Sequence, residues 1–171
     1  MESAEKEKIY IPVLASRRGE LIAWGSSFLV VILWLVLGAT GQQVMLAIPA
    51  LAVVLFVSAM SISLGNWMDR KTEMRIDNSS VAFTNGLRNV EMVWEEIQEV
   101  RAIPARWGKK VQVIGKKAYF GFQTLAEVIV MGEVKGRFGF IEGEDILRQI
   151  VLNSQLNIVE RPGEGYYYAR E

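Results

Sequence analysis

The side chains best suited to chemistry in this chain are basic and stand close together. Residues 101–117 carry six positive charges and one tryptophan, namely Arg101, Arg106, Trp107, Lys109, Lys110, Lys116 and Lys117. A basic side chain near a membrane surface is attracted to anionic headgroups by about 1 kcal/mol, so this cluster is a candidate patch for anionic lipid or a partner. The alternative is a solvated hairpin whose lysines protect an exposed strand edge. Glu95, Glu96 and Glu99 lie just upstream and cancel part of the positive field.

A second group of candidate residues lies near the C-terminus. Tyr166, Tyr167 and Tyr168 follow the break at Pro162-Gly163. Three consecutive tyrosines cannot all face one core, and tyrosine is favoured at protein interfaces. We therefore predict a tail that docks on a partner, and the alternative is a frayed terminus.

The chain lacks the residue types on which most catalytic and metal-binding sites depend. The chain has no His and no Cys, which removes the usual ligands of zinc, iron–sulfur and haem sites and the Ser-His-Asp arrangement. Glu95 and Glu96 are neighbours on a predicted strand and point to opposite faces. The glycines form neither a dinucleotide-binding nor a Walker pattern. We expect no catalytic residue, no metal ligand and no cofactor, and hence no enzyme.

The charge balance also limits the partners. The chain has 171 residues with 19 Lys+Arg and 19 Asp+Glu. A dedicated nucleic-acid-binding protein normally has a basic excess, so no nucleic-acid partner is expected. Without cysteine there is no disulfide, and the redox compartment cannot be read from the sequence.

The elements that position these residues begin with two apolar runs. No charged residue occurs between residues 21 and 65, and the stretch divides into runs at 21–37 and 44–64. As helices they would measure about 26 and 32 Å, against about 30 Å for a bilayer core. They predict a transmembrane helical hairpin. Small residues at four-residue spacing, Ala23/Ser27 and Ala59/Ser63, would let the helices approach closely, or are simply ordinary members of apolar helices.

The flanks of the runs indicate an orientation. They carry five basic residues, Arg17, Arg18, Arg70, Lys71 and Arg75, whereas the connecting loop has none. The positive-inside rule then predicts an integral membrane protein with both termini in the cytoplasm. A twin-arginine export signal at residues 16–19 and a cleaved signal peptide ending near residue 39 are alternatives. The second apolar run immediately afterwards favours the hairpin.

The polar remainder shows strand periodicity and then helix periodicity. Alternating runs separated by turn residues occur at residues 72–77, 81–84, 90–94, 97–103, 111–114, 118–122, 127–131 and 136–141. They predict a small antiparallel sandwich or barrel. Residues 144–156 then place Ile146, Leu147 and Ile150 on one helical face, and we expect Trp94 to pack beneath it. Three carboxylates at the helix start, Glu142, Glu144 and Asp145, suit the helix dipole.

Particular residues carry a resemblance to a known family. They are Arg75-Ile76-Asp77, the short turn to residues 81–84, residues 93–100 (VWEEIQEV), and the closing helix with Ile146, Leu147 and Ile150. Together with the hairpin, they resemble bacterial pleckstrin-homology-like (PH-like) domain proteins, over about residues 71–156. The resemblance implies an α+β membrane protein of the bacterial inner membrane, in which a PH-like domain closed by a C-terminal helix follows a two-helix hairpin. The tyrosine tail lies outside it.

The predicted organisation has four parts. They are a cytoplasmic N-terminal segment (1–20), the hairpin (21–65), the PH-like domain (66–157) and a C-terminal tail (158–171). We expect a non-catalytic accessory, assembly or structural subunit of a membrane protein complex. The alternative is a free-standing module that binds anionic lipid or peptide. The balanced charge favours the first.

Overall fold

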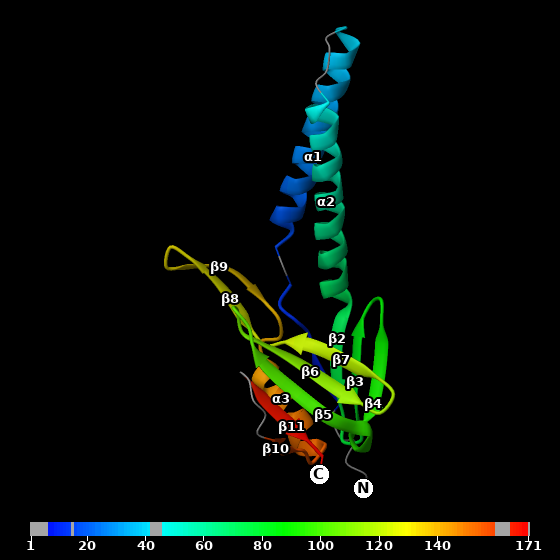
Figure 1. Ribbon diagram of the computed structural model, residues 1–171, viewed down its shortest axis with the longest axis vertical. Coiled ribbons are helices and arrows are strands. Elements are labelled where there is room, and N and C mark those ends of the chain that lie inside the picture. Colours follow the sequence, from blue (N-terminus) through cyan, green and yellow to red (C-terminus); the bar gives the residue numbers. More distant parts are fainter. Residues whose placement is uncertain (1–6, 15, 42–45, 160–164, 171) are drawn as a thin grey trace. The chain divides into compact units, whose positions relative to one another are not determined.

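The computed structural model describes residues 7–14, 16–41, 46–159 and 165–170 (Figure 1). The chain divides into two compact units. The first, Ser16–Met68, is helical. The second, which we call the β unit, comprises Met1–Ala15 together with Asp69–Glu171 and contains all the described strands. The β unit is therefore built from both ends of the chain.

Two long apolar helices dominate the first unit, α1 (Arg17–Ala39) and α2 (Ala47–Lys71). Ser16 caps α1, since its Oγ accepts a hydrogen bond from the backbone N–H of Arg18 (3.3 Å). Helix α1 extends beyond the predicted run 21–37 at both ends, whereas α2 begins later than the predicted run 44–64 and continues past its end to Lys71. By length and composition each is able to cross a membrane.

Small side chains make the contact between the two helices. Ser27 of α1 is 2% exposed, and Ala59 of α2 is fully buried. Their four-residue neighbours Ala23 and Ser63 are half-buried. Small residues at such positions let two helix backbones approach closely.

The β unit begins with an antiparallel four-stranded sheet. Its strands, in spatial order, are β1 (Lys8–Tyr10), β2 (Thr72–Ile76), β3 (Ser80–Asn85) and β4 (Asn89–Val93). Asp77 closes the β2–β3 turn, because its carboxylate accepts hydrogen bonds from the backbone N–H groups of Ser79 (2.6 Å) and Ser80 (2.7 Å). Gly86 in the β3–β4 turn has φ +78°, as the Asn85-Gly86 turn signal predicts.

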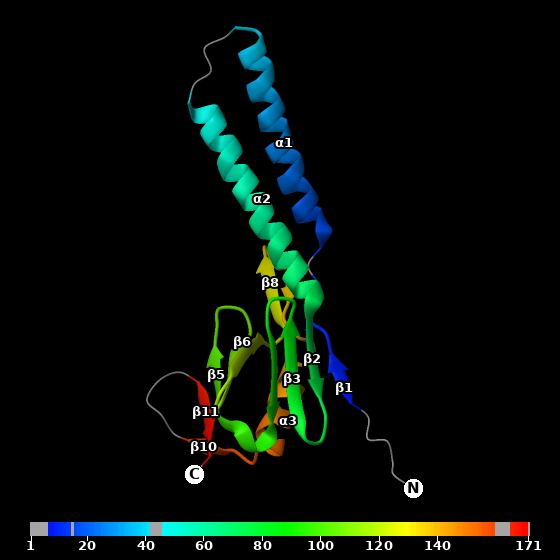
Figure 2. The ribbon, with the colours of Figure 1, turned by 90° about the vertical axis from the view of Figure 1, so that its right-hand side faces the viewer.

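A second sheet of five strands faces the first across the core. Its order is β10 (Asn157–Val159), β11 (Tyr166–Ala169), β5 (Ile97–Pro104), β6 (Lys109–Gly115) and β7 (Tyr119–Gln123). A separate two-stranded hairpin follows, β8 (Ala126–Val130) and β9 (Glu133–Phe138), and then helix α3 (Gly143–Asn153). Figure 2 shows β11 beside β5.

One buried cluster joins both sheets to α3. Ile146 and Ile150 of α3 are fully buried, and Trp94 is 4% exposed in the same cluster. The predicted α+β architecture is therefore present. No closed barrel forms among the described strands, which divide among three sheets. Strand β4 ends at Val93, one residue earlier than predicted, and Trp94–Glu96 forms a 3₁₀ turn (η1).

Both chain ends contribute strands that the sequence analysis placed outside the domain. Residues 1–20 were predicted as a separate segment, but β1 pairs with β2 through Ile9↔Arg75 and its neighbours. Residues 158–171 were predicted as a tail, but β11 lies between β10 and β5. The domain boundaries of 66 and 157 are thus too narrow. Strands of three or four residues have little periodicity of their own, so only pairing with a distant strand defines them.

Candidate functional site

The predicted basic cluster does not form one patch. Lys109 and Lys110 begin β6, next to the β5–β6 turn that holds Arg106 and Trp107, whereas Lys116 and Lys117 follow its far end. Seven strand residues cover about 24 Å at ~3.4 Å each. The register confirms the separation, because Lys109 pairs with Pro104 and Gly115 pairs with Ile97 at the other end of β5. The cluster therefore divides into two groups.

Two of the basic side chains are already engaged. Arg101 donates two hydrogen bonds to the carboxylate of Glu99, at 2.9 and 3.2 Å, and this pairing raises the pKa of the guanidinium above its ordinary value. The Nζ of Lys109 lies 2.9 Å from Glu144 of α3. Arg106 stacks its guanidinium over the ring of Trp107 (4.9 Å). The first group therefore consists of the stacked pair Arg106 and Trp107 together with Lys110. The second group consists of Lys116 and Lys117. All five side chains are exposed.

The three tyrosines of the predicted tail point to two faces of a strand. Tyr168 pairs with Val100 and packs against the core, while Tyr167 lies opposite Arg101 on the other face. Tyr166 shares the face of Tyr168 and is 52% exposed. Beyond them, the Nη2 of Arg170 donates to the backbone oxygens of Trp94 and Ser154, both at 3.1 Å. Tyr168 and Arg170 therefore have a folding role.

An apolar groove lies between α3 and β11. Its volume is about 370 Å³, and it is lined by Glu144, Leu147, Arg148, Val151, Leu152 and Tyr168. Ile158 of β10 is the cross-strand neighbour of Tyr168, so its side chain extends the same face. Leu152 and Ile158 are 63% and 66% exposed. The groove and Ile158 together form what we call the α3–β11 surface.

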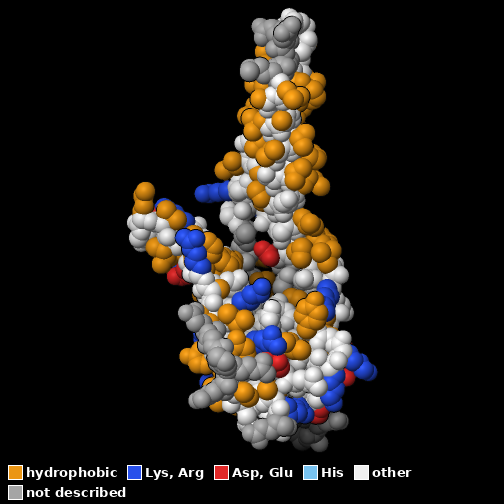
Figure 3. Space-filling model, viewed as in Figure 1, with side chains coloured by type: hydrophobic (Ala, Val, Ile, Leu, Met, Phe, Trp, Pro, Cys, Tyr) orange, Lys and Arg blue, Asp and Glu red, His pale blue; other side chains and the backbone are white. Residues whose placement is uncertain are grey.

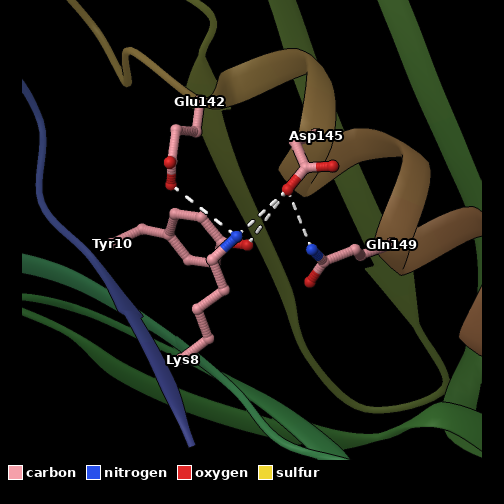
Figure 4. A network of polar contacts seen from close by, with 5 residues as sticks. All are labelled: Lys8, Tyr10, Glu142, Asp145 and Gln149. Carbon is pink, nitrogen blue, oxygen red and sulfur yellow. Dashed lines mark hydrogen bonds and ion pairs between the residues drawn. The ribbon is translucent and has the colours of Figure 1, made fainter.

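A polar network fastens the N-terminal segment to α3 (Figure 4). The Nζ of Lys8 donates to Asp145 (3.2 Å), the buried Tyr10 donates its hydroxyl proton to the same carboxylate oxygen (3.4 Å), and Gln149 also donates to it (2.9 Å). The hydrogen bonds with Tyr10 and Asp145 raise the pKa of Lys8 above its ordinary value. Glu142 lies 3.9 Å from Lys8. Sequence analysis assigned Glu142 and Asp145 to the helix dipole and missed this network, because β1 had no recognisable signal.

A second network joins α1 to α2. Ser63 and Asn66 of α2 donate hydrogen bonds to the two carboxylate oxygens of Glu20, at 2.8 and 2.9 Å. The indole Nε1 of Trp24 donates to Ser63 Oγ (2.8 Å). Polar bonds between apolar helices fix their pairing. The sequence contained one sign of this network, namely the carboxylate of Glu20 directly before the uncharged stretch 21–65.

The β8–β9 hairpin carries the other feature that the sequence analysis missed. Its end is apolar and exposed, with Ile129, Met131 and Val134 at 61%, 99% and 45%. Figure 3 shows hydrophobic side chains gathered there, with basic ones nearer the sheet. Residues 127–131 were assigned to the sandwich, but β8 pairs with β9 in a separate two-stranded sheet. The continuous apolar run 128–131 directly before a Gly turn was the available signal.

The described residues contain no group of three or more His, Cys, Asp and Glu side chains arranged to hold a metal ion. Three features are exposed at the surface of the β unit: the α3–β11 surface, the end of the β8–β9 hairpin and the two basic groups. No family model, curated protein or solved structure matches this chain.

Proposed function

We propose that this chain is a non-catalytic membrane protein that spans the bilayer twice and holds a PH-like domain at the cytoplasmic surface. There it acts as an accessory, assembly or structural subunit of a membrane protein complex. A segment of another subunit binds at the α3–β11 surface. The groove of about 370 Å³ on that surface is the observation that carries the proposal.

The composition of the β unit supports the two-span topology. The chain enters α1 from residues 7–14 and returns from α2 at Asp69, and both segments belong to the same folded unit. A folded domain cannot lie on both sides of a bilayer, so the start of α1 and the end of α2 lie on the same side. The basic residues Arg17, Arg18, Arg70 and Lys71 flank this side, which makes it the cytoplasmic one.

The chemistry of the α3–β11 surface supports a protein partner. Its centre is apolar, through Leu147, Val151, Leu152 and Tyr168, while Glu144 and Arg148 supply charges of both signs at its edge. An apolar centre with a polar rim is typical of protein interfaces. Since the surface has no net charge, it is better suited to an amphipathic segment than to an anionic headgroup.

The alternative, a module that binds anionic lipid, is supported by the group at the β5–β6 turn. Arg106 is stacked on Trp107, and Lys110 lies at the start of the next strand. Aromatic and basic side chains together are common at membrane interfaces. The separation of Lys116 and Lys117 from this group weakens the alternative, because a headgroup cannot contact both.

The topology is tested with single cysteines, since the chain contains none. A membrane-impermeant maleimide applied to intact cells should label a cysteine at Gln42 and leave one at Asn78 unlabelled. Asn78 is exposed in the β2–β3 turn, so its protection would come from the membrane and not from burial. The reverse pattern would place the β unit outside the cytoplasm and overturn the proposal.

The subunit function is tested by purifying the tagged full chain in mild detergent from its native membrane. We expect it to co-migrate with defined membrane proteins. Leu152→Ser with Ile158→Ser should release them, whereas Ile141→Ser, at a residue 68% exposed outside the groove, should retain them. A monodisperse chain free of partners, or equal retention by all variants, would contradict the proposal.

A further inference from the structure

The end of the β8–β9 hairpin is an exposed apolar tip. Ile129 and Val134 are cross-strand partners on one face, Val130 ends β8, and Met131 is the first residue of the turn. Met131 is 99% exposed, and Ile129, Val130 and Val134 are 61%, 46% and 45% exposed. Met131 and Gly132 have φ of 53° and 81°, as in the tight turns that end β-hairpins. Burying such side chains in an apolar phase is favourable, whereas exposure to water is not.

The hairpin's charges indicate which kind of surface meets this tip. Arg137 Nε lies 2.8 Å from Glu127, and Lys135 forms an ion pair with Glu133. The four charges therefore compensate one another within the hairpin. An acidic or basic partner gains little from such a surface, so the contact must be driven by the apolar tip.

The position of the tip within the β unit points to the bilayer. Strand β2 begins at Thr72, directly after Lys71 ends α2, so no linker separates the domain from the second span. Within the β unit, the hairpin extends toward the end at which β2 begins, and both ribbon views agree on this (Figures 1 and 2). Strand β8 has five residues and is therefore about 16 Å long.

An interfacial aromatic residue lies at the base of the same hairpin. The ring of Trp107 packs edge-on against Phe138 of β9, with centroids 6.2 Å apart. The indole is 40% exposed and carries Arg106 stacked above it. Tryptophan and arginine favour the headgroup level of a bilayer, with apolar groups below them.

We propose that the tip of the β8–β9 hairpin, Ile129, Val130, Met131 and Val134, inserts into the headgroup–acyl boundary of the membrane that α1 and α2 cross. It is a third, non-spanning contact, and together with the base of α2 it fixes the orientation of the β unit at the surface. This inference rests on the proposed membrane anchorage. Because burial of apolar side chains drives this contact, insertion of the tip does not require anionic lipid and does not weaken at high ionic strength.

The experiment uses the full chain reconstituted in phosphatidylcholine vesicles with single cysteines carrying an environment-sensitive fluorophore. A label at Met131→Cys should emit at shorter wavelength and be quenched by spin-labelled lipid several-fold more than a label at Asn78→Cys. Asn78 lies in the β2–β3 turn, at the opposite end of β2 from Thr72. Quenching at Met131 should persist at high salt and fall when Ile129→Ser and Val134→Ser are added.

A third label separates this inference from the proposed function. Val54 lies in α2 and is 60% exposed, so a label at Val54→Cys should be quenched by lipid if α2 spans the bilayer. Without quenching at Val54, the membrane anchorage itself is wrong. Quenching at Val54 without quenching at Met131, or quenching at Met131 that high salt abolishes, would overturn the apolar insertion.

Discussion

The side-chain Nζ of Lys8 lies 3.2 Å from Oδ2 of Asp145, across 137 positions of sequence. The hydroxyl of Tyr10 donates to the same oxygen (3.4 Å), and β1 pairs with β2 on the other side. The segment before the first helix is thereby held on the domain that follows the second. The two helices leave and re-enter the same folded unit.

Removal of the Tyr10 side chain should weaken the β unit. Tyr10 is 3% exposed, and truncation of a buried aromatic side chain costs about 3–5 kcal/mol. Tyr10→Phe is the matched control, since it keeps the ring and loses only the hydrogen bonds of the hydroxyl with Asp145 and Lys8, at about 1 kcal/mol each. Calorimetric unfolding of the purified chain measures both. Equal, small effects of the two substitutions would mean that β1 is not docked on the domain.

Trp94 should be essential to the core through its ring and not through its indole N–H. Its side chain is 4% exposed, and the Nε1 makes no hydrogen bond within the described part of the chain. Trp94→Ala should therefore cost about 3–5 kcal/mol of unfolding free energy, whereas Trp94→Phe should cost clearly less. Denaturant unfolding followed by circular dichroism compares them. An unchanged midpoint for Trp94→Ala would show that the assignment of the core is wrong.

Truncation after Pro162 should destabilise the domain. It removes β11, which lies between β10 and β5, and with it the two hydrogen bonds of Arg170. A loss of partners by the truncated chain would therefore not identify a binding tail. Tyr166→Ser is the better variant, because Tyr166 is 52% exposed and surface substitutions usually change stability by about 0.5 kcal/mol or less. A truncated chain with an unchanged melting temperature would contradict the folding role of β11.

Asp77 should make the β unit sensitive to acid. Burial alone would raise the pKa of its carboxyl, but hydrogen bonds from Ser79 and Ser80 outweigh this effect and hold the pKa below the ordinary 3.8. A carboxyl whose folded pKa is depressed stabilises the fold at pH values above the unfolded pKa. This contribution is lost as the pH falls through the folded pKa.

Asp77→Asn should accordingly be less stable than the wild type at neutral pH and should lose less stability on acidification. The difference in unfolding midpoint between the two proteins should narrow as the pH falls below 3.8. Melting curves measured across this range test the expectation. A constant difference at all pH values would show that the Asp77 carboxylate is not responsible.

Structural features that depend on residues close together in the sequence were predictable from the sequence alone. The uncharged stretch, the Asn85-Gly86 turn and the helical spacing of Ile146, Leu147 and Ile150 each depend on residues only a few positions apart. A helix or tight turn is specified by contacts within its own segment, so its signal is contained in that segment. The two helices, most of the strands and the buried face of α3 were therefore predictable.

Features that depend on distant pairing were decided only by the tertiary structure. Nothing near Ile9 identifies Arg75 as its partner, and nothing near Tyr168 identifies Val100, because a short strand can pair with any compatible edge. The basic residues are the converse case. They are close in sequence, but an extended β6 places Lys109 and Lys116 about 24 Å apart. Strands separate residues that are neighbours in sequence and bring distant segments together. The helices and most strands were therefore predictable from the sequence, whereas the strands at the two chain ends and the surfaces were not.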